Sequence, residues 1–231
     1  MADMRAMSKR AVVLLSGGLD STTAAWLARE SGFELFALSF DYGQRHAREL
    51  ESAALIAHDI GARQHQIVRI NVSDWAASSL TGQGEIPTES SGDSIPSTWV
   101  PARNHIFLAV ASGYAEVVGA SAIYIGVSQV DYSGYPDCRS EFIDAFQRAA
   151  DLASKRFVEE SVSIPVLAPF LHVPKSGVVR LGLALGVDYG QTWSCYQGGD
   201  VPCQRCDSCR LRAQAFAELG VPDPLLARQS G

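Results

Sequence analysis

The amino-acid sequence predicts an α/β protein built on a doubly wound parallel sheet. Short apolar runs alternate with helical patterns, which is the arrangement of a parallel sheet covered by helices. Hydrophobic residues make up 47% of the 231 residues and charged residues only 19%, which supports a sizeable core. The length suits one large domain with a small appendage, or two small domains.

The expected elements follow in chain order. Each predicted strand is a short apolar run, and four predicted helices are followed by a glycine, as helix C-termini often are (Gly32, Gly61, Gly119 and Gly186). The predicted strands are residues 11–15, 35–40, 66–70 and 122–127. The predicted helices are residues 21–30, 45–60, 104–118, 141–154, 175–185 and 211–219.

A glycine turn joins the first predicted strand to the first predicted helix. The strand is followed by Ser-Gly-Gly at 16–18 and then by Asp20, Ser21 and Thr22, whose side chains can cap a helix start. Glycines let the backbone approach an anion closely, and free N–H groups at a helix start point at it. No Lys follows the glycines, so the motif is not the Walker pattern. We interpret the turn as a phosphate-binding loop, the alternative being an ordinary glycine-rich connection.

This turn resembles the S-G-G-x-D-S signature of the PP-loop ATP pyrophosphatases, which have an adenine nucleotide alpha hydrolase-like, Rossmann-like fold. The resemblance implies that the loop holds the pyrophosphate of ATP while AMP is transferred. Asp20 is the candidate ligand of Mg²⁺ bound with ATP, and a simple N-cap is its alternative role. The expected ATP-binding residues are Leu15, Ser16, Gly17, Gly18, Leu19, Asp20, Ser21, Thr22, Thr23, Ala24 and Ala25.

The alternation of elements is interrupted by a polar stretch at residues 76–98, which is rich in Ser, Thr, Gly and Pro. A loop of this length is usually functional or disordered, so we expect a mobile cover over the nucleotide site, with a plain surface excursion as the alternative. From residue 190 onward the pattern is irregular around several cysteines and then helical. We therefore expect an ATP-binding domain at 1–189 and a metal-binding segment with a C-terminal helix at 190–231.

Net charge and hydropathy restrict the partners. The formal net charge is −6 and no run of Lys or Arg is present, so a nucleic acid is not expected as a partner, whereas a small anion is. The first apolar run has only five residues, too few for a signal sequence or a membrane span. We expect a cytoplasmic protein without membrane association.

Four of the five cysteines follow the pattern C-x7-C-x2-C-x2-C, at Cys195, Cys203, Cys206 and Cys209. Without a secretory signal, this spacing indicates a metal site rather than disulfides. Four thiolates close a tetrahedral Zn²⁺ site and leave no position for a substrate, so we expect one structural zinc per chain. Four buried thiols without a metal are the alternative.

Three further segments carry a resemblance that covers nearly the whole chain. They are Val-Pro-Ala-Arg-Asn at 100–104, Asp-Tyr-Ser-Gly-Tyr-Pro-Asp-Cys-Arg at 131–139, and Thr-Trp-Ser-Cys-Tyr at 192–196 running into the cysteine cluster. Together with the glycine turn they closely resemble the QueC family of queuosine-precursor biosynthesis. One departure is Gln204, where the family commonly has Gly.

The family resemblance implies a carbon–nitrogen ligase. Its substrates would be 7-carboxy-7-deazaguanine, ammonia and ATP, and the carboxylate would become a nitrile through adenylated carboxylate and amide intermediates. Transfer of AMP requires stabilised charge on phosphoryl oxygens. The candidate catalytic residues are Asp20, Arg103, which opens a predicted helix, and Lys175, which follows Pro174. Surface ion pairing is the alternative for Arg103, and a solvated lysine at a helix start is the alternative for Lys175.

Recognition of a flat, guanine-like ring is assigned to the segment that follows the fourth predicted strand. Aromatic rings can stack on such a ring and carboxylates can accept hydrogen bonds from its amine edge. The expected substrate-binding residues are Asp131, Tyr132, Tyr135, Asp137 and Glu141. Plain turn structure is the alternative for this segment. Cys138 is expected to be a buried or loop cysteine, because the implied reaction needs no thiol, and a nucleophile is its alternative role. A homodimer is a further expectation.

Two other functions compete with this interpretation. The first is a PP-loop ligase or thiolase that modifies tRNA, which the negative charge disfavours. The second is a non-catalytic zinc-knuckle binding module with a degenerate nucleotide fold, which the intact Ser16–Ser21 signature disfavours.

Overall fold

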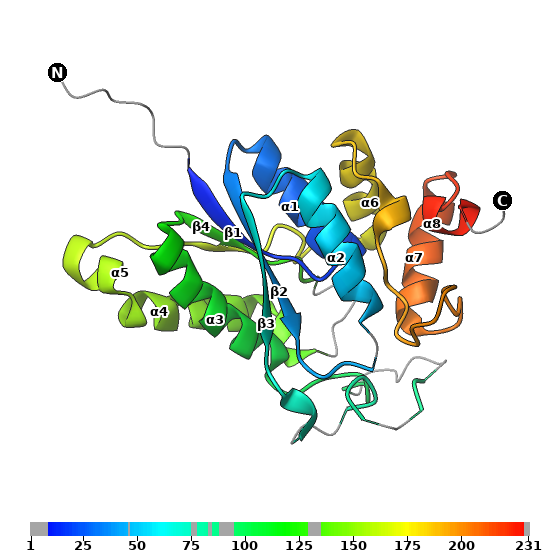
Figure 1. Ribbon diagram of the computed structural model, residues 1–231, viewed down its shortest axis with the longest axis horizontal. Coiled ribbons are helices and arrows are strands. Elements are labelled where there is room, and N and C mark those ends of the chain that lie inside the picture. Colours follow the sequence, from blue (N-terminus) through cyan, green and yellow to red (C-terminus); the bar gives the residue numbers. More distant parts are fainter. Residues whose placement is uncertain are drawn as a thin grey trace.

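The protein is a five-stranded parallel sheet covered by helices on both faces (Figure 1). The computed structural model describes residues 9–45, 47–74, 78–82, 85–87, 95–128 and 135–228. The strand order is β3-β2-β1-β4-β5, and every neighbouring pair is parallel. The strands are β1 (Arg10–Leu14), β2 (Glu34–Asp41), β3 (Gln64–Arg69), β4 (Ala122–Tyr124) and β5 (Val166–Leu167). The predicted fold class is confirmed.

Helices connect the strands and form the C-terminal part of the described chain. The α-helices are α1 (Leu19–Glu30), α2 (Arg48–Asp59), α3 (Arg103–Val118), α4 (Ser140–Ala153), α5 (Lys155–Glu160), α6 (Lys175–Ala184), α7 (Asp207–Glu218) and α8 (Pro224–Ala227). Short 3₁₀ turns are η1 (Val72–Asp74), η2 (Pro136–Cys138) and η3 (Tyr189–Gln191).

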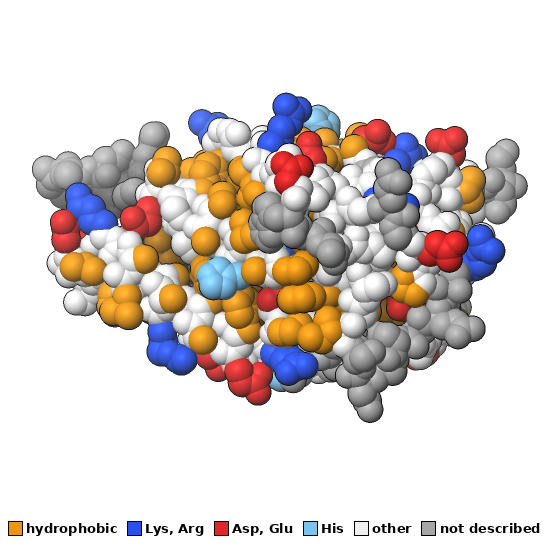
Figure 2. Space-filling view, turned by 90° about the horizontal axis from the view of Figure 1, so that it is seen from below, with side chains coloured by type: hydrophobic (Ala, Val, Ile, Leu, Met, Phe, Trp, Pro, Cys, Tyr) orange, Lys and Arg blue, Asp and Glu red, His pale blue; other side chains and the backbone are white. Residues whose placement is uncertain are grey.

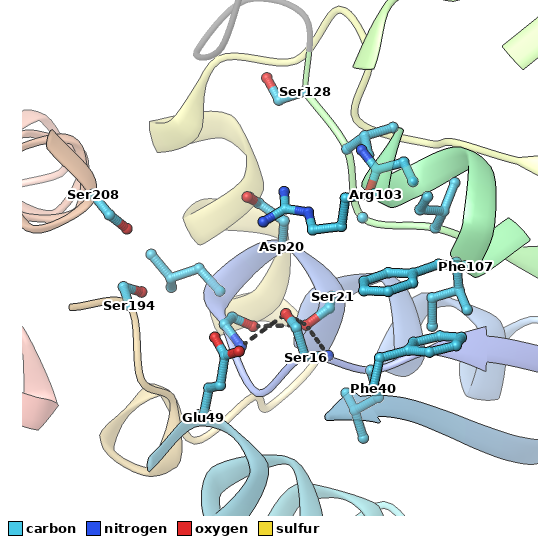
Figure 3. A pocket seen from close by; sticks show the side chains of 18 of the residues that line it. Ser16, Asp20, Ser21, Phe40, Glu49, Arg103, Phe107, Ser128, Ser194 and Ser208 are labelled. Carbon is cyan, nitrogen blue, oxygen red and sulfur yellow. Dashed lines mark hydrogen bonds between the residues drawn. The ribbon is translucent and has the colours of Figure 1, made fainter. Parts of the chain in front are cut away.

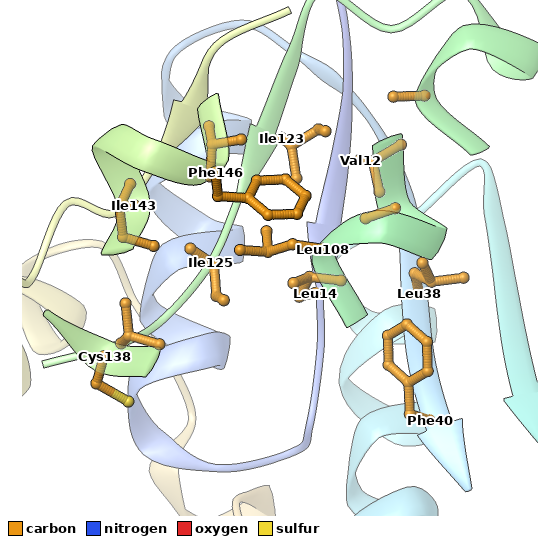
Figure 4. Close-up of a cluster of buried hydrophobic side chains, with 14 of the residues drawn as sticks. Val12, Leu14, Leu38, Phe40, Leu108, Ile123, Ile125, Cys138, Ile143 and Phe146 are labelled. Atoms are coloured by element: carbon orange, nitrogen blue, oxygen red, sulfur yellow. The ribbon is translucent and has the colours of Figure 1, made fainter. Parts of the chain in front are cut away.

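The central strand β1 is buried from both sides, which explains its continuous apolar sequence. Val12 and Leu14 point to the face covered by α3 and α4, where they pack with Leu108 and Phe146 (Figure 4). Val13 belongs to the opposite cluster, built with α1 and α2. Because successive strand residues face opposite sides, one apolar strand holds both helical layers together.

Several boundaries differ from the sequence-based expectation. Strand β4 ends at Tyr124 rather than at residue 127, and two residues further on Gly126 lies so close to the start of α1 that there is no room for a side chain. Helix α1 begins at Leu19, and its N-cap is Gly18 rather than Asp20, Ser21 or Thr22. Strand β5 and helices α5 and α8 were not expected, since each is six residues long or shorter.

The predicted loop at 76–98 is described at residues 78–82, 85–87 and 95–98, and the rest of it lies outside the described residues. Leu80 packs into the core beside Tyr42, and its carbonyl accepts the Arg45 backbone N–H at 3.1 Å. Ile86 is buried against Trp193 and the cysteine cluster. Leu80 therefore packs with the part of the chain predicted to bind ATP and Ile86 with the cysteine segment, while a covering role stays a prediction.

The face seen in Figure 2 gathers hydrophobic side chains between charged residues at its edges. The most exposed large hydrophobic residues are Val117 in α3, Leu152 in α4 and Val158 in α5, at 84%, 76% and 69%. The predicted homodimer stays a prediction. Within the described part of the chain, no helix has the length and apolar character needed to span a bilayer.

Candidate active site and metal centre

The glycine turn after β1 is held by hydroxyl groups. The Ser16 backbone N–H donates to Ser21 Oγ at 3.2 Å, and the two serine hydroxyls lie 3.0 Å apart. Ser21 Oγ and Thr22 Oγ1 donate to the Gly18 carbonyl, at 3.2 and 2.7 Å. The hydroxyls predicted to cap the helix thus fix the shape of the turn instead.

Glycine is required at Gly17 and Gly126 by close contacts. Gly17 has φ +81°, and a Cβ there would lie 2.3 Å from the Glu49 carbonyl oxygen in α2. At Gly126 a Cβ would lie 2.5 Å from the Ser21 backbone nitrogen. The turn and the start of α1 therefore pack closely against α2 on one side and against the chain after β4 on the other.

A cavity of about 210 Å³ opens beside this turn (Figure 3). It lies at the carboxyl ends of β1 and β4, the neighbouring strands between which the strand order reverses, where ligands bind in open α/β sheets. Charged and polar side chains from several elements converge there. They are Ser16, Asp20, Ser21, Glu49, Arg103, Asn104, Ser128, Lys175, Ser194, Ser208 and Arg212.

Asp20 and Lys175 form an ion pair in the cavity. The Lys175 Nζ lies 2.6 Å from Asp20 Oδ2, and the side chains are 8% and 17% exposed. The second carboxylate oxygen, Asp20 Oδ1, is buried and has no hydrogen-bond partner among the described residues. A metal cation would fit this buried carboxylate oxygen.

Arg103 opens α3, as predicted from the sequence, and Figure 3 shows its side chain reaching across the cavity toward Asp20. The preceding residue, Ala102, adopts a left-handed φ of 56°. The guanidinium carbon lies 6.0 Å from the centre of the Tyr42 ring. Arg103 belongs to the cavity rather than to a surface ion pair, so its charge is available to an anion.

Six of the eleven predicted ATP-binding residues line the cavity: Leu15, Ser16, Gly18, Leu19, Asp20 and Ser21. The other five are not among the lining residues. Gly17 packs on α2, Thr22 and Thr23 donate hydroxyl hydrogen bonds to backbone carbonyls, and Ala24 and Ala25 are buried in the core.

Of the predicted substrate-binding residues, the structure places Tyr135 in the wall of the cavity. Its hydroxyl lies 2.6 Å from Thr98 Oγ1. Asp137 is buried and accepts the Asn104 backbone N–H at 2.9 Å, so it supports the start of α3. Glu141 is exposed on α4, and neither Asp137 nor Glu141 is among the lining residues. Asp131 and Tyr132 lie outside the described residues.

Sequence reasoning missed Glu49 and an aromatic wall. Phe40 and Phe107 stack with ring centres 3.9 Å apart, and Tyr42 lies next to them. Burial raises the pKa of Glu49 to about 7, against the lowering effects of Arg103 and a Gln44 hydrogen bond. Burial likewise raises the pKa of Tyr42. Glu49 is one of several acidic residues in α2, and only the contact of α2 with the glycine turn distinguishes it.

Cys138 also lines the cavity, but its environment disfavours a thiolate. Burial raises the pKa of the Cys138 thiol to about 12, although Arg103 opposes this effect. Asn104 Nδ2 lies 3.3 Å from its sulfur. A thiol with this pKa is not an effective nucleophile at neutral pH, as expected for an inert cysteine.

The four clustered cysteines form a metal-binding geometry. The sulfur atoms of Cys195, Cys203, Cys206 and Cys209 all lie within 4.8 Å of one another. Backbone N–H groups of Gln197 and Cys203 donate to the Cys195 sulfur, at 3.4 and 3.3 Å, and others donate to the Cys203 sulfur. Neighbouring thiols lower the pKa of Cys195, whereas hydrogen bonding to Cys195 raises that of Cys206 to about 11. A bound cation is what would allow all four to be thiolates, so the site fits a metal.

The cysteine cluster also shapes the cavity. Ser194 and Tyr196 flank Cys195, Ser208 precedes Cys209, and all three line the cavity. The Trp193 indole, another lining group, donates to the Cys195 carbonyl at 3.0 Å. The metal site therefore holds one wall of the candidate active site.

Comparisons with known proteins agree with this geometry. The family described as "Queuosine biosynthesis protein QueC" matches residues 10–220. The 7-cyano-7-deazaguanine synthase of Pseudomonas syringae pv. tomato is 51% identical over 218 residues, 94% of this chain and 96% of that protein. That of Clostridium kluyveri is 49% identical over 219 residues, 94% of this chain and 97% of that protein.

Among solved structures, an NMN synthetase from Francisella tularensis aligns with a TM-score of 0.50 and 15% identity. The alignment covers 94% of this chain and 79% of that chain, and it supports the fold alone. The sequence matches extend over nearly the whole chain and include the glycine turn and the cysteine cluster. The chain therefore belongs to the QueC family of queuosine biosynthesis proteins.

Proposed function

We propose that this protein converts 7-carboxy-7-deazaguanine and ammonia into 7-cyano-7-deazaguanine with ATP, as a carbon–nitrogen ligase. The observation that carries the proposal is the convergence of the glycine turn, Arg103 and the Asp20–Lys175 pair in one cavity of a QueC-family chain. Relatives named 7-cyano-7-deazaguanine synthase support the same reaction.

The first half-reaction activates a poor electrophile. The substrate carboxylate attacks the α-phosphorus of ATP, and pyrophosphate leaves, giving an acyl adenylate. The free backbone N–H groups at the start of α1 would donate to the phosphates, and Arg103 and Lys175, which line the same cavity, would supply positive charge. Ammonia then displaces AMP to give the amide, and a second adenylation of the amide oxygen allows its loss as AMP, leaving the nitrile.

A Mg²⁺ ion bound with ATP would be held by Asp20, whose Oδ1 is buried without a partner among the described residues. It would supply charge neutralisation on the triphosphate. Lys175 orients the same carboxylate through Oδ2. Asp20 thus has one oxygen for its lysine partner and one for a cation.

The flat ring of the acid is expected to lie against Tyr135, whose ring forms part of the cavity wall. The four cysteines would hold one zinc ion, which supplies folding energy to residues 195–209. Trp193, Ser194 and Tyr196 would keep their places in the cavity as a result.

The test is product analysis by mass spectrometry after incubation with 7-carboxy-7-deazaguanine, Mg-ATP and ¹⁵N-labelled ammonium. The expected product is the nitrile carrying one ¹⁵N, with AMP and pyrophosphate as nucleotide products. The control omits ammonium and should give no nitrile. Formation of ADP as the main nucleotide, or an unchanged acid, would reject the proposal.

A further inference from the structure

We propose that the Glu49 carboxylate binds ammonium and accepts its proton, so that neutral ammonia is released beside the activated substrate. The inference rests on the proposed function, in which ammonia is the nucleophile. The inference adds a binding site for ammonium, the cationic form of ammonia and its main form at neutral pH.

The position of Glu49 is fixed relative to the glycine turn. It lies in the first turn of α2, and its backbone carbonyl would be 2.3 Å from a Cβ at Gly17. Its side chain lines the same cavity as Ser16, Gly18 and Arg103 (Figure 3). The carboxylate therefore lies beside the loop expected to bind the phosphates of ATP, close to where the acyl group is transferred.

The negative charge of Glu49 is not balanced by any of the ion pairs recorded in the described part of the cavity. The ion pairs recorded among described residues that line the cavity join Lys175 to Asp20 and Arg212 to Asp223, and neither includes Glu49. Arg103 attracts the Glu49 carboxylate without forming one of these pairs. A carboxylate next to an anion-binding loop repels phosphate unless a further positive charge joins it. A cation that enters with the substrates would remove that repulsion.

The surroundings favour ammonium over a metal ion. Mg²⁺ takes an octahedral set of oxygen ligands, usually carboxylates, phosphates and water, and Asp20 already offers a buried oxygen to such an ion. Near Glu49 the wall includes the aromatic ring of Tyr42, which is close enough for the charge of Glu49 to raise its pKa. A small cation with N–H donors can bond a carboxylate and lie against aromatic rings.

The pKa of Glu49 suits a group that accepts a proton from ammonium. Burial raises the pKa of Glu49 to about 7, with Arg103 of α3 and Gln44, which follows β2, acting in the opposite direction. Tyr42 keeps its proton, because burial and the charge of Glu49 raise its pKa. Of the other charged groups that line the cavity, Asp20 and Lys175 are paired with each other, and Arg212 is paired with Asp223. A base titrating near the working pH is the most effective proton acceptor.

The proposed step balances as follows. One N–H bond of ammonium breaks, the proton moves to a Glu49 carboxylate oxygen, and the nitrogen lone pair attacks the carbonyl carbon of the acyl adenylate. The bond from that carbon to the AMP oxygen breaks, and AMP leaves with the electron pair. The nitrogen gives one further proton to the departing AMP oxygen. The products are the amide, AMP and protonated Glu49, which returns its proton to solvent.

The test compares Glu49→Gln with the control variant Glu51→Gln. Glu51 is an exposed residue of the same helix, and its side chain pairs with Arg48. Ammonium and hydroxylamine are supplied in turn as the nucleophile at pH 7.5 with saturating Mg-ATP and acid. Hydroxylamine is mostly unprotonated at this pH and needs no base. Glu49→Gln should lower kcat/KM for ammonium about 100-fold, while hydroxamate formation stays within about threefold of the unmodified protein. Glu51→Gln should change neither.

The pH profile gives a second measurement. In the unmodified protein kcat/KM for total ammonium should rise with pH and level off above about 7, where Glu49 is ionised. In Glu49→Gln, kcat/KM for total ammonium should keep rising about tenfold per pH unit. The reason is that only free ammonia, which requires no base, then reacts, and its concentration rises with pH.

Three results would overturn the inference: equal losses with both nucleophiles, an unchanged ammonium response, or a raised Mg²⁺ requirement, which would make Glu49 a metal ligand. Failure of the proposed function is distinguishable from these. It would appear in the unmodified protein as an absence of acid-dependent exchange of labelled pyrophosphate into ATP.

Discussion

The Lys175 ammonium lies 2.6 Å from the Asp20 carboxylate, which joins the first turn of α1 to the first residue of α6. Both side chains are largely buried, so each charge depends on the other. The pair fixes the two helix starts on either side of the cavity. Asp20 Oδ1, which has no hydrogen-bond partner among the described residues, stays available to a cation.

Replacing Lys175 by Met should destabilise the protein by about 3–5 kcal/mol, because it leaves an uncompensated buried carboxylate. The double variant Lys175→Met with Asp20→Asn should recover part of this loss. Urea unfolding of the single and double variants measures both effects. Lys155→Met is the control, since its ion pair with Glu159 is exposed and should contribute about 0–1 kcal/mol. Equal stability of Lys175→Met and the unmodified protein would show that the pair has no structural role.

Asp20→Asn should weaken turnover and the response to Mg²⁺ together. The amide keeps the size of the side chain but loses the charge that fits a cation at Oδ1. The measurement is the rate of AMP formation as Mg²⁺ is varied at fixed ATP. A higher Mg²⁺ requirement with a lower maximal rate is expected. An unchanged Mg²⁺ requirement would leave Asp20 as the partner of Lys175 alone.

The fold could be predicted because the strands that organise it are buried on both faces. Strands β1 and β2 are nearly uninterrupted apolar runs, which is typical of strands in a parallel sheet covered on both faces. Strand β5 could not be predicted, because two residues carry no periodicity and it exists only by pairing with β4. The early end of β4 could not be predicted either, because Gly126 lies against α1, and local sequence does not encode this contact.

The site was predictable where the chemistry is local in sequence. The glycine turn and the cysteine cluster each form within a short segment, and the spacing of their residues dictates their geometry. Glu49 and the aromatic wall depend on contacts between distant segments. Nothing in the sequence of α2 separates Glu49 from Glu51, and only the approach of Gly17 to α2 places one of them in the cavity.

Gly126→Ala should impair both folding and ATP binding. A Cβ at this position would lie 2.5 Å from the Ser21 nitrogen and 2.7 Å from the Asp20 carbonyl carbon, so the start of α1 must move. We expect a loss of about 1–3 kcal/mol, typical of overpacking, and a weaker binding of ATP by calorimetry.

Gly113→Ala is the matched control, since a Cβ there meets no atom within 4 Å and lies in the exposed face of α3. It should stabilise the helix by about 0.5–1 kcal/mol. If Gly126→Ala binds ATP as tightly as Gly113→Ala, the contact with α1 does not shape the loop.

Glu49 should make stability fall as pH rises. Its pKa is raised from 4.5 to about 7 in the folded state, so the folded protein binds more protons than the unfolded chain between these values. Stability therefore decreases through this window, and the burial cost is complete above pH 7. Glu49→Gln should be more stable than the unmodified protein by about 2 kcal/mol at pH 8 and by much less at pH 5. Thermal unfolding at both values tests this, and a gain that does not depend on pH would contradict the shifted pKa.

Removal of the metal should open one wall of the cavity as well as loosen the C-terminal segment. Cys203→Ser removes one of four sulfur ligands, and the segment that they hold includes Ser194, Tyr196 and Ser208 of the cavity wall. We expect less than one equivalent of zinc per chain by elemental analysis, a lower Tm, and weaker ATP binding, because structural zinc contributes directly to folding energy. Trp193 donates to the Cys195 carbonyl, so its fluorescence should change when a chelator removes the metal.

Cys138→Ser, outside the cluster, should keep its zinc. Iron in place of zinc, or a metal-free protein with unchanged Tm, would reject the assigned site, whereas loss of zinc with unchanged ATP binding would separate the metal from the cavity.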